Sequence, residues 1–214
     1  RVELCRAMHL DGLTPTEQNI IAARKAFQDR SGLMVMIRPR GGDFNYSQEE
    51  IELMQQQIEM AAQANANGVV FGIIEKSTNV IASQPLVELV KLSKNLNLQT
   101  TFHRAFDTTP EPLESLKLLI DAGIDRVLTS GTPWDSNKTA LDGIEKLRQL
   151  METANDRIEL IVGGGVNNKN AAEILNALTG NTDSFSLHAY SGVQENGFTT
   201  STAVRSLVAT ANKE

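Results

Sequence analysis

The feature that most constrains the fold is a regular alternation of strand-type and helix-type patterns along the chain. Seven short apolar segments occur, and each is followed by an amphipathic segment. The strand centres recur roughly every 27–35 residues, which is the size of successive βα units. This alternation predicts an α/β fold built on a parallel sheet. The predicted strands span residues 2–5, 33–38, 68–74, 98–103, 125–130, 157–162 and 184–188.

Local signals indicate where the helices begin. Thr14, followed by Pro15 and Glu17, predicts a helix start with Thr14 as the capping residue and proline at the first helical position. Ser47 with Glu50 three residues later has the pattern of a capping box. The predicted helices span residues 14–30, 47–65, 83–95, 109–123, 139–155, 168–178 and 200–211.

The number of units bears on the choice of α/β architecture. A doubly wound sheet also alternates strands and helices, whereas a (β/α)8 TIM barrel has eight units in about 250 residues. This chain of 214 residues shows seven units, and Arg1 runs directly into a strand. We therefore expect one TIM-barrel domain over residues 1–214 that lacks its first strand and helix, about 20–30 residues. On this reading the turn at residues 163–165 follows barrel strand seven and His188 ends strand eight, where barrel enzymes commonly bind phosphate.

Period-2 alternation aims polar side chains at the interior of this barrel. Side chains on the outer face of a barrel strand must be apolar to pack on the helices. Four strands nevertheless carry polar residues on the other face, and buried charges must be paired or serve a purpose. This pattern predicts a functional barrel mouth; the alternative is a structural pair of Glu3 with Arg38. The predicted inward residues are Glu3, Cys5, Met36, Arg38, Thr101, His103, Ser184, Ser186 and His188.

The segment at residues 100–107 concentrates ionisable groups at the end of one strand. His103 ends the strand, and Arg104 and Asp107 follow in the loop. Chemistry in α/β proteins usually occurs at the carboxyl ends of the strands. The alternative is a satisfied core histidine beside a surface pair of Arg104 and Asp107.

Composition excludes several classes of protein. A net charge of −6 and a pI near 5.2 argue against nucleic-acid binding. No apolar run approaches the ~18–20 residues of a membrane span, and no signal-peptide pattern occurs. Cys5 is the only cysteine, so an internal disulfide is impossible. We therefore expect a reduced, cytoplasmic setting.

Seven short motifs occur in order along the chain: VELC (2–5), GLTP (12–15), MIRPRGGD (36–43), GVVFG (68–72), FHRAFD (102–107), RVLTSG (126–131) and GGG (163–165). Together they resemble one known family, the CutC copper homeostasis proteins. The resemblance covers essentially the whole chain in the same order, and it implies a single, cytoplasmic (β/α)8 barrel that is often a homodimer. It also implies that Glu3, Cys5, Arg38, Arg40, Asp43, His103, Arg104 and Asp107 are signature positions. Family chains carry a preceding strand with a second cysteine, which this chain lacks.

One functional hypothesis is copper binding. Cu(I) favours thiolate, thioether and imidazole ligands, and Cys5, Met36, His103 and His188 are all predicted to point inward. They lie on different strands without CxxC spacing, and a buried lone cysteine usually behaves as a small hydrophobe. Cys5 is the one candidate copper ligand.

The second hypothesis is an enzyme that acts on a small anionic or phosphorylated metabolite. Arg38 and Arg40 flank a strand end and would bind a carboxylate or phosphate. Backbone N–H groups of the glycine turn would hold an anion. His103 would act as general acid or base, supported by Glu3, Arg104 and Asp107, in a lyase, isomerase or hydrolase. The other predicted ligand-binding residues are Asp43, Ser130, Gly163, Gly164, Gly165 and His188.

Two further interpretations stay open. A scaffold whose surface matters most predicts that the mouth residues are replaceable. The loop at residues 131–137, which holds the only tryptophan, is either a lid over the mouth or an exposed loop or oligomer contact.

Overall fold

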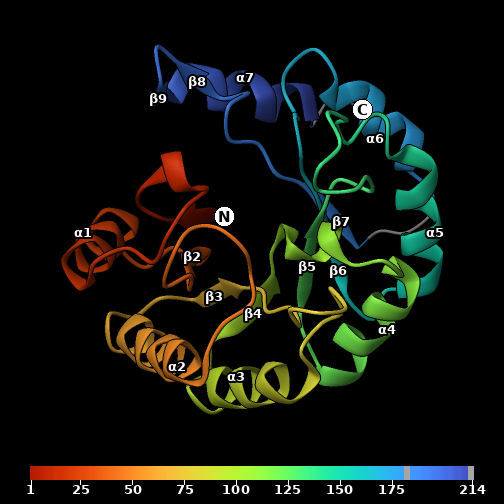
Figure 1. Cartoon of the computed structure of the whole chain (residues 1–214). Helices are drawn as coiled ribbons and strands as arrows, with labels where there is room; N and C mark the ends of the chain where they lie inside the picture. The colour runs from red at the N-terminus through yellow and green to blue at the C-terminus, as the bar shows by residue number, and fades with distance from the viewer. Residues whose placement is uncertain (181–183, 212–214) are drawn as a thin grey trace.

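The computed structural model describes residues 1–180 and 184–211. Seven parallel strands pair in the order of the sequence and form one curled sheet (Figure 1). This confirms the predicted α/β barrel class with its seven βα units. The strands are β1 (Val2–Leu4), β2 (Leu33–Met36), β3 (Gly68–Phe71), β4 (Gln99–Phe102), β5 (Arg126–Thr129), β6 (Glu159–Val162) and β7 (Phe185–Leu187).

Helices follow the strands and surround the sheet on its outer side (Figure 1). The seventh helix lies beside a small antiparallel hairpin, β8 (Gln194–Glu195) and β9 (Phe198–Thr199). Two short 3-10 helices, η1 (Met8–Leu10) and η2 (Arg104–Thr108), follow β1 and β4. The α-helices are α1 (Glu17–Phe27), α2 (Gln48–Gln63), α3 (Ser83–Asn95), α4 (Pro112–Ala122), α5 (Ile144–Ala154), α6 (Ala171–Leu178) and α7 (Ser201–Ala211).

The helix starts were predicted with mixed success. The capping box of Ser47 and Glu50 is present at the start of α2. The predicted cap at Thr14 is wrong, because Thr16 caps α1 by accepting a hydrogen bond from the Asn19 N–H. Thr14 instead links two elements: its hydroxyl donates to Gln57 at 2.7 Å and accepts from the Arg38 N–H at 2.7 Å.

The fifth helix also starts later than predicted. Residues 140–143 form turns, and α5 begins only at Ile144. Asp142 accepts hydrogen bonds from the backbone N–H and hydroxyl of Thr139, at 2.8 and 2.9 Å. This side-chain bonding offers the backbone an alternative to helix.

The two faces of the sheet pack differently. The outer residues of β2, β3 and β4, such as Val35, Phe71 and Phe102, are fully buried in the main core between the sheet and the helices. Inside the curl, Met34, Met36 and Val70 form a smaller apolar cluster against which Cys5 packs. The predicted inward direction of Met36 and Cys5 is therefore confirmed.

A cluster of ionic groups ties the amino ends of the strands together. Glu159 on β6 accepts from Arg1 at 2.7 Å and from Arg126 at 3.0 Å. Arg1 also donates to Ser186 on β7 at 2.8 Å. The start of β1 is thereby held against β6 and β7, which maintains the curl. None of the helices in the described residues combines the length and apolar character that crossing a membrane requires.

Candidate functional site

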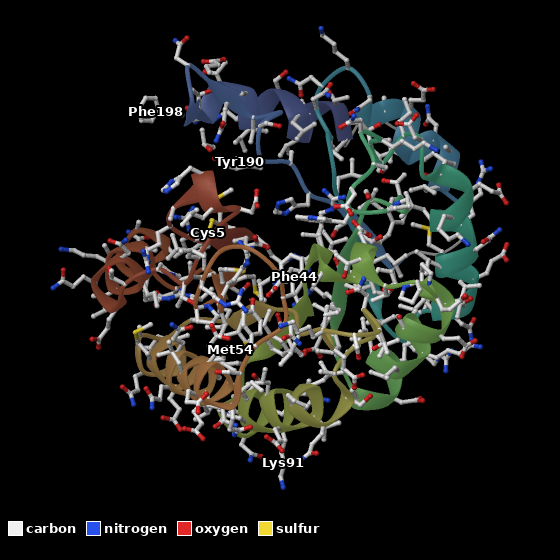
Figure 2. The ribbon with its side chains drawn as sticks, viewed as in Figure 1. Cys5, Phe44, Met54, Lys91, Tyr190 and Phe198 are labelled. Atoms are coloured by element: carbon white, nitrogen blue, oxygen red, sulfur yellow. The ribbon has the colours of Figure 1, made fainter. Side chains whose placement is uncertain are left out.

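A cavity of about 600 Å³ opens at the carboxyl ends of the strands and extends toward α7. Figure 2 shows Cys5 and Phe44 toward the middle of the fold, whereas Lys91 points away from it. All five ionisable residues that we predicted to face inward line this cavity, namely Glu3, Cys5, Arg38, His103 and His188. The predicted loop residue Arg104 lines it too, together with Gly164 and Gly165.

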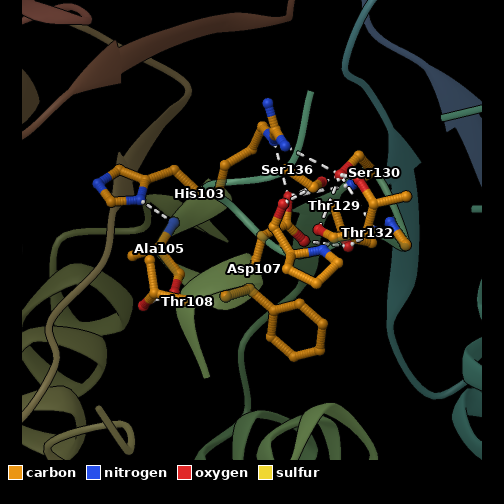
Figure 3. A network of polar contacts seen from close by, with 12 residues as sticks. His103, Ala105, Asp107, Thr108, Thr129, Ser130, Thr132 and Ser136 are labelled. Atoms are coloured by element: carbon orange, nitrogen blue, oxygen red, sulfur yellow. Dashed lines mark hydrogen bonds and ion pairs between the residues drawn. The ribbon is translucent and has the colours of Figure 1, made fainter. Parts of the chain in front are cut away.

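His103 is held in a defined orientation at the end of β4. Its side chain is only 5% exposed, and Nδ1 accepts a hydrogen bond from the Ala105 N–H at 3.1 Å (Figure 3). The proton of a neutral imidazole must then reside on Nε2. Burial, with a smaller effect from the charge of Arg38, lowers the pKa of His103 to about 3. A neutral hydrogen-bond donor therefore describes this ring better than the acid or base role predicted from the sequence.

Arg104 is fixed by a buried polar network (Figure 3). Its Nε donates to Asp107 at 2.7 Å and its Nη2 donates to Ser130 at 2.9 Å. Asp107 is anchored in turn by the Thr129 hydroxyl, the Ser130 N–H and the Ser130 hydroxyl. Burial raises the pKa of Asp107, and the charge of Arg104 opposes this shift. Asp107 thus orients the guanidinium from behind through its hydrogen bond with Arg104 Nε. The sequence did not indicate Thr129, because its side chain lies on the outer face of β5.

Glu3 on β1 and His188 after β7 face the same cavity from the two edges of the curled sheet. Burial raises the pKa of the Glu3 carboxyl, and the nearby charge of His188 lowers it. Both residues line the cavity. A carboxyl with a raised pKa in a cleft is a candidate for proton transfer, so the predicted catalytic role of Glu3 stays open.

Cys5 faces a second sulfur atom that the sequence analysis missed. Its Sγ lies 3.0 Å from the Sδ of Met8, a residue of η1. Burial raises the pKa of the Cys5 thiol to about 11, and the charge of Glu3 adds to this effect. The sequence signal that could have identified this pair is the spacing of three residues between the two sulfur-containing side chains.

Arg38 and Arg40 hold the loop after β2. Arg38 is 1% exposed, and its guanidinium donates to the carbonyls of Gly12 at 3.2 Å and Gly42 at 2.8 Å. These bonds, rather than a pair with Glu3, occupy the Arg38 side chain. Arg40 binds Glu50 at 2.6 Å and Asp43 at 2.9 Å. The geometry of both arginines favours a structural role over the predicted anion role.

The three glycines of the turn after β6 differ in their surroundings. Gly163 still belongs to the sheet, since its N–H donates to Thr129 O at 2.9 Å. Gly164 and Gly165 have positive φ angles of 104° and 76°, which other residues rarely adopt. A side chain on Gly164 would lie 2.9 Å from Cβ of Ser130 and 3.7 Å from the Arg104 guanidinium. Glycine at this position therefore keeps the space beside Arg104 open.

Two aromatic side chains from different loops close the mouth. Phe44 follows β2, and its ring centre lies 4.9 Å from that of His103. Trp134 follows β5 and contacts Phe44 edge to face, with ring centres 5.6 Å apart. Both line the cavity. This placement favours the lid interpretation of the 131–137 loop.

The described residues contain no group of three or more His, Cys, Asp or Glu side chains placed together to hold a metal ion. Any metal site in this part of the chain must therefore use other ligands as well or have fewer of these groups.

Comparisons with known proteins agree with the fold. The family model "CutC family" matches residues 1–189. A CutC family protein of Bacteroides fragilis is 46% identical over 175 residues, covering 81% of this chain and 66% of the relative. One from Glaesserella parasuis is 42% identical over 176 residues, covering 82% and 68%. The chain thus spans about two thirds of the length of the curated relatives that it matches.

A solved structure extends this agreement. CutC from Streptococcus agalactiae, a protein assigned to copper homeostasis, superimposes with a TM-score of 0.78 at 32% identity. The superposition covers 87% of each chain.

Proposed function

Because the chain belongs to the CutC family, we propose that it serves in copper homeostasis and binds Cu(I) as its cargo. The family membership supports the biological role. The observation that carries the chemistry is the pair of sulfur atoms, Cys5 Sγ and Met8 Sδ, at 3.0 Å. Thiolate and thioether are the soft ligands that select Cu(I).

The surroundings of the sulfur pair suit a soft ion. Met36 belongs to the apolar cluster against which Cys5 packs, and both residues line the cavity. A side chain on Gly12 would lie 3.4 Å from the Cys5 sulfur and 3.5 Å from the Met8 sulfur. Glycine at this position therefore leaves room beside both atoms.

Binding of Cu(I) to Cys5 would displace the proton of the thiol. The Cys5 thiol is half-buried and its pKa is raised to about 11, so it is protonated at neutral pH. Cu(I) binds the thiolate, and binding therefore releases the thiol proton. The free thiol stays unreactive toward other electrophiles until the metal arrives, because the thiolate is the reactive form.

The test is an anaerobic Cu(I) titration against a competing chelator. Wild type is expected to bind one equivalent tightly, Cys5→Ser to lose this binding, and Met8→Leu to weaken it by about tenfold or more. Met60→Leu is the matched control, because Met60 packs against the main core on α2. Unchanged affinity in Cys5→Ser would contradict the proposal.

A further inference from the structure

The Arg104 guanidinium has neighbours at Nε, at Nη2 and against its flat face, whereas its Nη1 remains available to a ligand. Asp107 and Ser130 bind its Nε and Nη2, and the ring of Trp134 stacks on its face at 5.0 Å. Within the described residues its Nη1 has no hydrogen-bond partner. The side chain is 28% exposed and lines the cavity. A guanidinium whose rotamer is locked by its neighbours loses little entropy when it binds an anion.

The neighbouring glycine marks the position that an anion would take. A Cβ on Gly164 would lie 3.7 Å from Arg104 Nη1. The positive φ of 104° at Gly164 favours glycine independently of the space. The conformation of the turn thus leaves the free corner of the guanidinium accessible from the cavity.

A second donor in the same cavity wall is unsatisfied. The Nε2 atom of His103 is buried and has no partner among the described residues. Because Nδ1 accepts from Ala105, Nε2 carries the proton and can only donate. A buried donor without a partner is destabilising, and such groups in native proteins call for an explanation. An acceptor on a ligand would satisfy it.

The rings of Phe44 and Trp134 limit which ligands can reach Arg104 Nη1 and His103 Nε2. Phe44 covers the His103 ring at 4.9 Å, and Trp134 lies between Phe44 and Arg104. A ligand that meets both donors must be small, with an anionic end for Arg104 and an uncharged oxygen for His103. The imidazole is neutral and Arg38 stands nearby, so it polarises a carbonyl without adding a charge.

We propose that the barrel mouth binds a small phosphorylated carbonyl compound, with its anionic group on Arg104 beside Gly164 and its carbonyl oxygen on His103 Nε2. This site uses none of the atoms of the sulfur pair at Cys5 and Met8, although both sites face the same cavity. It also replaces the predicted anion ligands Arg38 and Arg40, whose donors hold the loop after β2.

Isothermal titration calorimetry with three probes tests the proposal. Dihydroxyacetone phosphate carries both recognised groups, inorganic phosphate only the anion, and dihydroxyacetone only the carbonyl. Wild type is expected to bind the first most tightly and the last most weakly. Saturable quenching of Trp134, the only tryptophan, should follow the same order. No binding of dihydroxyacetone phosphate, or equal affinity for dihydroxyacetone, overturns the assignment.

Two variants separate the two donors. Arg104→Met should weaken both phosphate probes by about tenfold or more, whereas the control Arg30→Met should not, because Arg30 is exposed and bonds to the carbonyls of α1. His103→Asn keeps an acceptor for Ala105 but lacks the Nε2 donor. It should weaken dihydroxyacetone phosphate and leave inorganic phosphate unchanged. If folded Arg104→Met binds both phosphate probes as tightly as wild type, the contact with Arg104 is overturned. If folded His103→Asn binds dihydroxyacetone phosphate as tightly as wild type, the contact with His103 is overturned.

A measurement on wild type covers the case in which a variant fails to fold. The Nε2 proton resonance of His103 should shift when dihydroxyacetone phosphate is added and should not shift with inorganic phosphate. The absence of a shift with the phosphorylated ketone removes His103 from the site.

Discussion

The guanidinium carbon of Arg104 lies 5.0 Å from the centre of the Trp134 ring. The contact joins the loop after β4 to the loop after β5 and places the only tryptophan at the mouth of the cavity. Intrinsic fluorescence of this protein therefore reports on the mouth directly, and it serves as a local probe in the experiments below.

Removing the charge of Asp107 should destabilise the fold. Its side chain is 2% exposed and pairs with Arg104, so Asp107→Asn breaks a buried pair and should cost roughly 3–5 kcal/mol. Urea denaturation followed by circular dichroism measures this loss, and Trp134 emission should change as Arg104 is released. Asp43→Asn is the control, because the side chain of Asp43 is 67% exposed and its pair with Arg40 contributes about 0–1 kcal/mol. An equal loss of unfolding free energy in Asp107→Asn and Asp43→Asn would contradict the expectation that the Asp107 pair contributes more.

His103 should make the protein less stable in mild acid. Its pKa is about 3 in the fold and near 6.5 when unfolded, so the unfolded state binds the proton first. Stability that is present above pH 6.5 is therefore lost as the pH falls toward 3, on the order of 3 kcal/mol by pH 4. In His103→Asn this part of the pH dependence should disappear. Denaturation at a series of pH values measures it, with exposed His9→Asn expected to keep the wild-type profile.

Protonation of Glu159 should destabilise the fold in a lower pH range than protonation of His103. Hydrogen bonds from Arg1 and Ser186 and the charges of Arg1 and Arg126 lower its pKa to about 2, against the opposing effect of burial. A lowered carboxyl pKa gives stability above the unfolded value of about 4.5 that is lost as the pH falls to 2. Glu159→Gln should therefore cost about 1–2 kcal/mol at pH 7, allowing for partial exposure, and little at pH 2. A pH-independent loss would point to packing instead.

Gly72→Ala should displace His103. A Cβ at Gly72 would lie 2.5 Å from Cε1 and 2.6 Å from Nδ1 of the imidazole. We expect a loss of about 1–3 kcal/mol from overpacking and a broken hydrogen bond from Ala105. Histidine NMR should show Nδ1 freed from that bond, and an unchanged spectrum would contradict this.

The fold was predictable because its signals are local. The apolar run of β2 and the capping pattern at Ser47 each depend only on residues that are close together in the sequence. The first helix cap was wrongly assigned to Thr14 for the opposite reason. Its hydroxyl bonds to Gln57 and Arg38, which are distant in sequence, and these tertiary contacts move the cap to Thr16.

The site was predictable only in part. Alternation identified the inward residues Glu3, Cys5 and His103, which share one cavity. The alternation could not show which hydrogen-bond partners the polar side chains have in the fold. Arg38 and Arg104 have the same chemistry, yet the terminal nitrogens of Arg38 donate to loop carbonyls, whereas Nη1 of Arg104 has no partner among the described residues. That difference depends on where separate loops meet, which spacing in the sequence does not encode.

The ionic cluster at the amino ends of the strands bears on the order of assembly during synthesis. Each strand of the sheet pairs with the strand made immediately before it, so the sheet can grow as the chain leaves the ribosome. Arg1 is different, because its carboxylate partner lies 158 residues later. A nascent chain that ends after β5 would hold Arg1 and Arg126 together without Glu159. The curl of the sheet therefore becomes fixed only when β6 has emerged, because Arg1 gains its carboxylate partner at that stage.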